Sequence, residues 1–263
     1  MKKDSPLHKK PMNKFKRISN HYKKQFEAQK RNKTYHKGAE ALTQIEIAKD
    51  PKRTEVMNYL LSLFKRDTTY LEIGVRNPDD NFNHIQATKK YSVDPGVEYK
   101  ENPVDFQMTS DAFFEKLKQN AILSNTIKFD VIFIDGLHLA DQVDTDIVNA
   151  LQYLKNDGFI VLHDCNPTTQ WHAREEHAYF GSPAKNFWSG TTWKAFAKWR
   201  TNPSIYSCCI DSDWGIGILT KTHNIGKSIE MANPFYEFHV LEKNRKEYLN
   251  LIDFQTLKAI LEP

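Results

Sequence analysis

The chain has 263 residues, of which 40% are hydrophobic and 27% charged, a composition ordinary for a soluble globular protein with one large domain and an appendage. Its net charge of +4 is uneven: residues 1–40 hold thirteen Lys and Arg against three Asp and Glu, or +10, which leaves −6 for the remainder. No apolar run approaches the ~20 residues of a membrane helix, and the basic N-terminus lacks the apolar core of a secretory signal, so we expect neither feature.

The three cysteines are Cys165, Cys208 and Cys209. Two adjacent cysteines on a strand point to opposite faces and make poor disulfide partners. Together with the missing secretory signal, this indicates a reducing, cytoplasmic setting.

The N-terminal segment, residues 1–50, is predicted to be a basic extension. Residues 1–17 are rich in Lys and contain two prolines, so we expect disorder there, while residues 18–50 fit one or two polar helices. Such a tail could attach to an anion, such as nucleic acid, a membrane or a polyanionic glycan, or it could be a solvated arm. Charge runs specify partners weakly, so the solvated arm is the preferred interpretation.

Helical and extended patterns alternate from Thr54 onward. Apolar spacing predicts the helices, short apolar runs predict the strands, and Ser110 has the position of a helix cap. The elements expected in the first half are a helix from residue 54, strands at 68–75 and 91–94, a weak strand near 105–109 and a helix at 111–119.

The second half begins with the most informative stretch, KFDVIFIDGLHLADQV, residues 128–143. Its β-branched and aromatic run predicts a strand buried on both faces, which stops at Asp135 and Gly136 before a helical pattern starts. The elements expected after that strand are a helix to about residue 154, a turn at 156–158, a strand at 159–164, a helix at 192–198, a hairpin of 204–210 and 214–219, and helices at 236–249 and 254–261.

This order of elements predicts the fold class. Strands that alternate with helices form parallel sheets, whereas two runs joined by a short polar turn form an antiparallel hairpin. We therefore expect an α/β protein with a doubly wound, mostly parallel sheet and an antiparallel terminal hairpin strand.

Acidic residues stand at or just beyond the ends of successive predicted strands. Because the carboxyl ends of parallel strands meet at one edge of a sheet, these acids should share a rim where ligands bind. They are Glu72, Asp94, Asp111, Asp135 and Asp164.

The first strand ends on Gly74, where a glycine lets a ligand approach the backbone before the next helix. Asp94 lies 20 residues after Gly74, the spacing of an acid that binds ribose hydroxyls. Arg76 and Pro78 follow this glycine, and the G-x-G-x-x-G motif of dinucleotide-binding proteins is not present. The pattern argues against a dehydrogenase and favours a ligand with ribose and adenine but no pyrophosphate.

Five segments, LEIGV, SVDP, TSDAFF, FDVIFIDGLH and GFIVLHD, resemble the successive motifs of class I S-adenosylmethionine-dependent methyltransferases over about residues 54–219. The Asp-Gly-x-His element is similar to small-molecule and sugar O-methyltransferases, including metal-dependent macrolide-sugar enzymes. The resemblance implies a Rossmann-like fold and a methyltransferase domain, which we place at residues 51–222. Residues 165–200 interrupt the alternating pattern and are rich in aromatic residues, which predicts an aromatic lid insert there. Residues 1–50 would be a partly disordered or helical N-terminal extension, and residues 223–263 a C-terminal helical extension.

On the cofactor side, the resemblance assigns a contact to each predicted residue. It implies that Glu72 and Gly74 face the methionine part of S-adenosylmethionine. Asp94 would bind the ribose hydroxyls. Ser110 and Asp111 would border adenine, with Asp111 accepting a hydrogen bond from the amino group.

On the acceptor side, the resemblance implies that Asp135 and Asp164 hold a divalent metal, Mg²⁺ being the candidate, and that His138 is the base. Asp135 would border the cofactor as well and take part in catalysis. Carboxylate oxygens suit Mg²⁺, which acidifies a bound hydroxyl, and a histidine can take the proton as methyl passes from sulfur to oxygen. Related metal-dependent enzymes have an acidic or amide ligand beside the position of Asp164, where this chain has a histidine and a cysteine. The metal could be completed by His163 or Asn166, or be absent.

Structural roles are the alternative for the same residues. Asp135 could simply end a strand, and His138 could start a helix with its side chain bonded to backbone. Glu72 could pair with a lysine, and Asp94 could cap the turn that follows it. The combination of Asp135, His138 and Asp164 favours function.

The predicted lid contains four polar residues that lack the rigid spacing of a metal motif, so we interpret them as loop residues. Alternatively, one of the two histidines among them enters the site. The set is His172, Glu175, Glu176 and His177.

The predicted lid is also rich in aromatic side chains, which suit sugars or phenols as acceptors. These side chains are Trp171, Trp188, Trp193 and Trp199 with Tyr179, Phe180 and Phe187. Trp193 and Trp199 are expected to pack the insert onto the body.

The favoured function is O-methylation of a small polar acceptor such as a sugar hydroxyl. The alternatives are an RNA methyltransferase that uses the basic tail and a non-catalytic Rossmann-like binding protein. The Asn/Asp-Pro-Pro-aromatic motif of base N-methylation is missing, and acids at every strand end argue against a decayed site. We expect a small-molecule or glycan acceptor rather than nucleic acid, and a homo-oligomer stays open.

Overall fold

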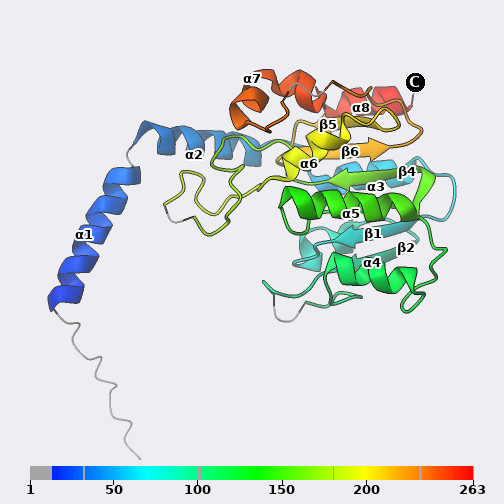
Figure 1. Ribbon diagram of the computed structural model, residues 1–263, viewed down its shortest axis with the longest axis horizontal. Helices are drawn as coiled ribbons and strands as arrows, with labels where there is room; N and C mark the ends of the chain where they lie inside the picture. Colours follow the sequence, from blue (N-terminus) through cyan, green and yellow to red (C-terminus); the bar gives the residue numbers. More distant parts are fainter. Residues whose placement is uncertain (1–13, 32, 100–101, 180, 231–232, 263) are drawn as a thin grey trace, which may run out of the picture.

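The computed structural model describes residues 14–31, 33–99, 102–179, 181–230 and 233–262. Its centre is a seven-stranded sheet of order β2-β1-β3-β4-β6-β5-β7 (Figure 1). The strands are β1 Thr69–Ile73, β2 Lys89–Val93, β3 Phe129–Ile134, β4 Leu154–Leu162, β5 Tyr206–Ile210, β6 Ile216–Thr220 and β7 Leu251–Ile252. Strands β1 to β4 pair in parallel, and β6 runs antiparallel to both β4 and β5. The predicted fold class, with its antiparallel hairpin, is confirmed.

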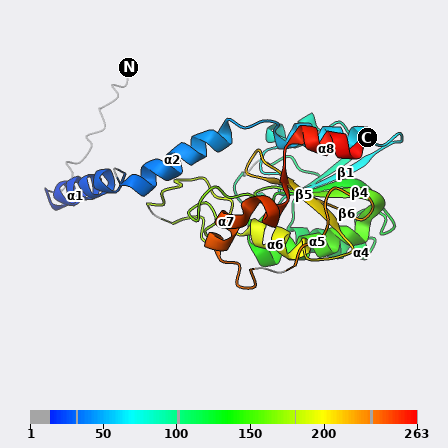
Figure 2. The same cartoon turned by 90° about the horizontal axis from the view of Figure 1, so that it is seen from above.

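Helices cover both faces of the sheet. The helices are α1 Lys14–Arg31, α2 Thr34–Ile47, α3 Arg53–Ser62, α4 Ser110–Lys118, α5 Ala140–Tyr153, α6 Thr192–Trp199, α7 Phe238–Leu249 and α8 Phe254–Leu261, with 3-10 turns at Pro78–Asp80 and Phe82–His84. One buried cluster joins α4, α5, α6 and α7 to the sheet, and the other joins α3 and α8 to its opposite face (Figure 2).

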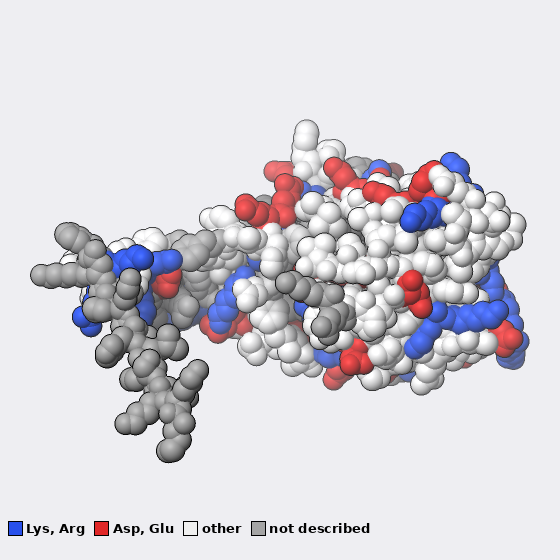
Figure 3. Space-filling view, turned by 90° about the horizontal axis from the view of Figure 1, so that it is seen from below, with Lys and Arg blue, Asp and Glu red and all other residues white. Residues whose placement is uncertain are grey.

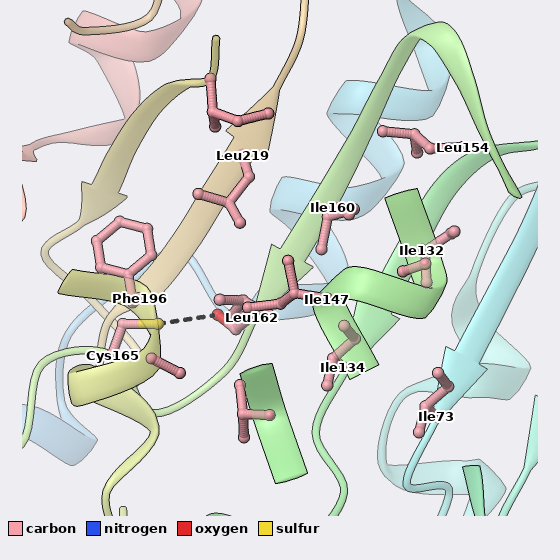
Figure 4. Close-up of a cluster of buried hydrophobic side chains, with 14 of the residues drawn as sticks. Ile73, Ile132, Ile134, Ile147, Leu154, Ile160, Leu162, Cys165, Phe196 and Leu219 are labelled. Carbon is pink, nitrogen blue, oxygen red and sulfur yellow. Dashed lines mark hydrogen bonds between the residues drawn. The ribbon is translucent and has the colours of Figure 1, made fainter. Parts of the chain in front are cut away.

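Strand β3 lies at the centre of this core, as its sequence predicts. All six of its residues are buried. Ile132 and Ile134 belong to the cluster drawn in Figure 4, whereas Val131 and Phe133 belong to the cluster on the other face. The alternation follows from the two-residue repeat of a strand, and it explains why a strand covered on both faces has a continuous apolar run.

Three local predictions differ from the structure. The turn predicted at 156–158 is part of β4, which starts at Leu154 and is bulged against β3. The weak strand near 105–109 is a single bridge from Phe106 to Val93, because the Asp105 carboxylate takes the Ser92 N–H at 2.9 Å. The cap of α4 is one residue earlier than predicted.

Thr109, not Ser110, is that cap. The Thr109 hydroxyl accepts a hydrogen bond from the Ala112 N–H at 3.3 Å, and Ser110 is the first residue of the helix. Both residues have a side-chain hydroxyl, so composition alone does not distinguish them.

Helices α1 and α2 project from the body (Figures 1 and 2). Figure 3 shows Lys and Arg gathered on this projection, while both charge signs are mixed over the body. The disorder predicted for residues 1–17 falls largely outside the described residues, although α1 begins at Lys14. Within the described part of the chain, no helix is long and apolar enough to span a membrane. The predicted domain boundaries at residues 50 and 222 stay predictions.

Candidate active site

A cavity of about 780 Å³ opens at the carboxyl ends of β1 to β4. All eight residues that the sequence singled out for cofactor, metal or base line this one cavity. They are Glu72, Gly74, Asp94, Ser110, Asp111, Asp135, His138 and Asp164. We call the first five the cofactor half and the last three, with the side chains around them, the acceptor half.

Gly74 brings the backbones of the two halves into contact. It has a φ of +91°, and a Cβ built on it would lie 2.2 Å from the carbonyl oxygen of Asp135. A side chain at this position would be strained and would collide with main chain, so only glycine fits. The sequence predicts a glycine here for ligand approach, and the structure adds this backbone contact.

Glu72 is buried, with only 3% of its surface exposed. Its carboxylate accepts hydrogen bonds from the Tyr70 hydroxyl at 2.7 Å and from the Asn81 amide at 2.8 Å, so its partners are not a lysine. Burial raises the pKa of Glu72 to about 7, although the two hydrogen bonds act in the opposite direction.

Asp94 both caps a turn and lines the cavity. Its Oδ1 accepts the Gly96 N–H at 2.6 Å and the Asn102 amide at 3.2 Å. Asp94 therefore does cap the turn, as the structural alternative predicted. The turn occupies its Oδ1, and the residue also borders the cavity.

Ser110 and Asp111 are joined by a residue that the sequence analysis did not identify. The Nε2 of Gln142, from α5, donates to the Asp111 carboxylate at 3.1 Å and lies 3.3 Å from the Ser110 hydroxyl. Gln142 also lines the cavity, so α5 helps to shape the cofactor half.

The acceptor half is centred on His138. Its Nε2 lies 3.3 Å from Asp135 Oδ1, and its Nδ1 lies 3.1 Å from Asp164 Oδ2. One possible ligand atom from each of these three residues lies within 4.8 Å of the others. Strands β3 and β4 end side by side, and their ends bring Asp135 and His138 next to Asp164, which lies 29 and 26 positions later in the sequence.

Cationic side chains surround the same carboxylates. Arg53, the first residue of α3, donates to Asp135 at 2.5 Å and to Asp213 at 2.9 Å. The Nδ1 of His163 lies 3.2 Å from Asp135 and 3.1 Å from Asp164. Asn166, the alternative to His163 for completing a metal site, instead contacts Asp211 and Arg245.

Arg53 and Asp213 were missed by the sequence analysis. They are 160 residues apart, and the hairpin turn of Asp211-Ser212-Asp213 reads only as a turn. Strand β6 runs antiparallel beside β4, so the turn before β6 lies next to the end of β4. The backbone bonds from Cys165 N to Gly215 O at 2.9 Å and from Asn166 N to Trp214 O at 2.8 Å hold it there.

The electrostatics of the acceptor half differ for its acids and its histidines. Burial acts to raise the pKa of Asp135, but His163 and Arg53 outweigh burial and hold it well below its usual range. Burial acts to lower the pKa of His138, but Asp164 and Asp135 raise it to about 9. At neutral pH the His138 imidazole therefore holds a proton in the ligand-free protein, and it must release this proton before it can act as a base.

The predicted lid covers this half. The Trp188 ring stacks on His138 at a centroid distance of 5.0 Å and an interplanar angle of 16°, and its carbonyl lies 3.2 Å from His138 Nδ1. Phe187 and Trp214 stack on each other at 5.5 Å and line the cavity, as does His177.

The remaining lid residues divide between core and surface. Trp193 is buried, and Trp199 donates to Asp144 at 2.8 Å, so both join the insert to the body as expected. His172 is fully buried rather than a surface loop residue, and it bonds Thr43 of α2 at 3.0 Å. Phe180 lies outside the described residues.

Comparisons with known proteins identify a family for the chain. The family model described as a methyltransferase domain matches residues 27–165, more than half of the chain. No curated protein matches the sequence. The match begins within α1 and ends just after β4, so the lid and the hairpin lie outside it.

Several solved structures are similar to the chain. An O-methyltransferase from Bacillus cereus in complex with SAH is 14% identical, with a TM-score of 0.40, and the alignment covers 72% of this chain and 92% of that one. An SAH-bound methyltransferase from Podospora anserina is 13% identical, with a TM-score of 0.43 and coverage of 84% and 100%. An O-methyltransferase of tomaymycin synthesis from Streptomyces achromogenes, in complex with SAM, is 11% identical, with a TM-score of 0.41 and coverage of 73% and 91%.

The family match covers the segment that holds Glu72, Gly74, Asp94, Asp111, Asp135 and His138. It agrees with the five motifs from which the sequence analysis inferred the class. The chain therefore belongs to the methyltransferase-domain family and is a class I S-adenosylmethionine-dependent methyltransferase.

Proposed function

We propose that the chain transfers the methyl group of S-adenosylmethionine to a hydroxyl of a small polar acceptor, such as a sugar. The observation that supports this most strongly is the position of His138. It lies between two carboxylates, in the same cavity as the predicted cofactor residues. A base is needed for a hydroxyl acceptor, because the attacking oxygen must lose its proton.

In the proposed cofactor half, Gly74 leaves room for the methionine part of the cofactor, and the buried Glu72 carboxylate faces its ammonium group. Asp94 binds the ribose hydroxyls through the oxygen that the turn leaves unused. Ser110 and Asp111, held by Gln142, border adenine. Each role follows from the resemblance, and the common cavity supports the set.

In the proposed reaction, an acceptor oxygen attacks the methyl carbon while the carbon–sulfur bond breaks. The hydroxyl proton moves to the neutral form of the His138 imidazole, and the products are the methyl ether and S-adenosylhomocysteine. Asp135 and Asp164 stabilise the imidazolium that forms, because each lies within 3.3 Å of a ring nitrogen. Much of the rate comes from holding the two reactants in line.

A divalent metal fits the same side chains. The carboxylates of Asp135 and Asp164 offer the hard oxygen ligands that Mg²⁺ prefers, and His138, in the same group, would stay the base. A bound Mg²⁺ would lower the pKa of the acceptor hydroxyl. Arg53 and His163 already contact these carboxylates, so the ion would have to compete with two cationic side chains.

The lid supports a sugar or another polar ring as acceptor. Trp188, Phe187 and Trp214 offer aromatic faces, and Asn186 and His177 add polar groups to the same wall. Aromatic rings pack on the C–H faces of sugars, while neighbouring polar groups bind hydroxyls.

An acceptor screen tests the proposal. The full chain is incubated with S-adenosylmethionine labelled in its methyl group and with panels of free sugars, glycosides, phenols and RNA, each with Mg²⁺ or with chelator. Label in a sugar or phenol ether is the expected result, and label only in RNA would overturn the acceptor class. Equal turnover with saturating chelator would exclude the metal and leave His138 as base.

Calorimetry with S-adenosylhomocysteine on the same preparation completes the test. We expect binding, because the cofactor half is preformed without an acceptor. A protein that binds no S-adenosylhomocysteine would contradict the proposed placement of the cofactor.

A further inference from the structure

Helix α2 reaches the acceptor half although it belongs to the projecting N-terminal segment. Its residues contact the lid and the hairpin turn at separate points (Figure 1). Each contact leads through a short chain of hydrogen bonds or ring contacts to an aromatic wall of the cavity. The extension is therefore structurally connected to the place where we propose that the acceptor binds.

The end of the lid is attached to the backbone of His138. The Thr191 N–H donates to the His138 carbonyl at 2.7 Å, and the Thr191 hydroxyl accepts the Ala140 N–H at 2.8 Å. Gly190 has a φ of +58°, and a Cβ there would lie 2.1 Å from the same His138 carbonyl. Trp188, two residues earlier, is thereby held over the His138 ring.

His172 supports this lid end from the other side. Its carbonyl accepts the N–H groups of Ser189 at 3.0 Å and Gly190 at 3.1 Å. A displacement of His172 would therefore shift the segment that carries Trp188.

The His172 ring is fixed by Thr43 of α2. The Thr43 hydroxyl lies 2.8 Å from the Ala39 carbonyl and donates its single proton there. The His172 Nε2, 3.0 Å from the same hydroxyl, must then be the donor, and its Nδ1 accepts from Thr169 at 2.8 Å. The neutral Nε2–H tautomer satisfies both ring nitrogens of a fully buried side chain.

A second connection from α2 reaches Trp214. The buried Glu46 carboxylate accepts the Trp214 N–H at 2.9 Å, and the Trp214 ring lies 5.1 Å from that of His172. The ion pair from Glu40 to Lys185 also joins α2 to the lid, but both side chains are more than half exposed, so it contributes little.

We propose that α2 is a positioning element of the acceptor half, in which Thr43 and Glu46 set the places of Trp188 and Trp214. The inference rests on the proposed function only in assuming that the acceptor lies against these rings. The N-terminal segment then does more than extend the chain, because acceptor recognition depends on it.

Hydrogen–deuterium exchange of the full chain tests the positioning directly. The Thr43→Val variant keeps the shape but removes the acceptor of the His172 N–H, so we expect the amides of Ser189, Gly190 and Thr191 to exchange about tenfold faster, as for one lost hydrogen bond. The Thr43→Ser variant restores the hydroxyl and should exchange like wild type.

Thr145→Val on α5 is the matched control. The exposed Thr145 hydroxyl donates to the carbonyl four residues earlier, as that of Thr43 does, but within the described part of the chain that carbonyl is its only hydrogen-bond partner. Its substitution should leave the lid amides unchanged. The Glu46→Ala variant should speed exchange at the Trp214 amide instead.

Lid exchange rates in Thr43→Val that equal those of wild type, or an increase that Thr43→Ser does not reverse, would overturn the proposal. Calorimetry with S-adenosylhomocysteine on each variant should give an unchanged Kd. A wild type that binds none would instead contradict the proposed function, so the two failures are distinct. With an acceptor from the screen, Thr43→Val should raise the acceptor KM about tenfold and leave the KM for S-adenosylmethionine unchanged.

Discussion

The cofactor half of the cavity is built from backbone turns and single carboxylates, whereas the acceptor half is built from a dense group of charges. Residues of the cofactor half lie between positions 72 and 111, next to β1, β2 and the start of α4. Side chains around the acceptor half lie between positions 53 and 214 and come from α3, β3, β4, the lid and the hairpin turn. Local chain geometry therefore places most of the cofactor half, with Gln142 of α5 as a long-range contact, whereas long-range packing assembles the acceptor half.

The largest expected effect is on the rate of methyl transfer, when only the proposed base of the acceptor half, His138, is replaced. The His138→Gln variant should lower the rate of methyl transfer at least about 100-fold, because general base catalysis contributes about that much. Single-turnover assays with an acceptor from the screen measure the loss. The Kd for S-adenosylhomocysteine should not change, and activity equal to wild type would rule out His138 as base.

The contact between the two halves is tested by Gly74→Ala. Its Cβ would collide with the Asp135 carbonyl at a positive φ, so we expect the free energy of unfolding to fall by about 2–4 kcal/mol and cofactor binding to be lost. Urea denaturation and calorimetry measure both effects.

Gly136→Ala is the control, since its Cβ would make only ordinary contacts, with Ile73 at 3.6 Å and with the Gly74 Cα at 4.0 Å. It should leave the free energy of unfolding nearly unchanged. Equal stability of the two variants would show that the backbone contact does not constrain the fold.

The charge group of the acceptor half is tested by Arg53→Gln. Removal of this guanidinium leaves the carboxylates of Asp135 and Asp213 with His163 as their remaining shared partner, so we expect a loss of about 3 kcal/mol in the free energy of unfolding. Arg76→Gln is the matched control in the cofactor half, because its pair with Asp80 is exposed and should be worth less than about 0.5 kcal/mol. A loss in Arg53→Gln no larger than in Arg76→Gln would contradict the interpretation.

The smallest expected effect is a pH dependence confined to the cofactor half. Glu72 becomes charged as the pH rises through about 7, so the affinity for the ammonium group of S-adenosylhomocysteine should rise about tenfold from pH 6 to pH 8. Calorimetry measures this, and a Glu72→Gln variant should lose the dependence. Without ligand, stability should fall as the pH rises from 4.5 to about 7, because the unfolded chain releases this proton first.

The two halves also differ in how well the sequence predicts them. Gly74 and Asp94 follow predicted strands directly, and strand order alone brings such residues to one edge. Arg53 and Asp213 have no local signal, because their pairing depends on where α3 and the hairpin pack. His172 shows the same limit: its sequence neighbours are polar, but the fold buries it against α2.

Local boundaries failed for a related reason. The bulge in β4 contains Asp157 and Gly158, which normally mark a turn, yet Arg66 holds the Asp157 carboxylate at 2.8 Å and the strand continues. A side chain from the distant loop between α3 and β1 thus overrides turn propensity.

The reversed direction of β6 has a consequence for how this enzyme can diversify. Because β6 enters the sheet antiparallel to β4, its preceding turn adds one more connection to the rim beyond those of the parallel strands. That turn and the lid both lie outside the segment matched by the family model. Changes in the length or composition of these two loops would alter the acceptor wall without interrupting β1 or β2, so a new acceptor could be accommodated while the methyl donor stays the same.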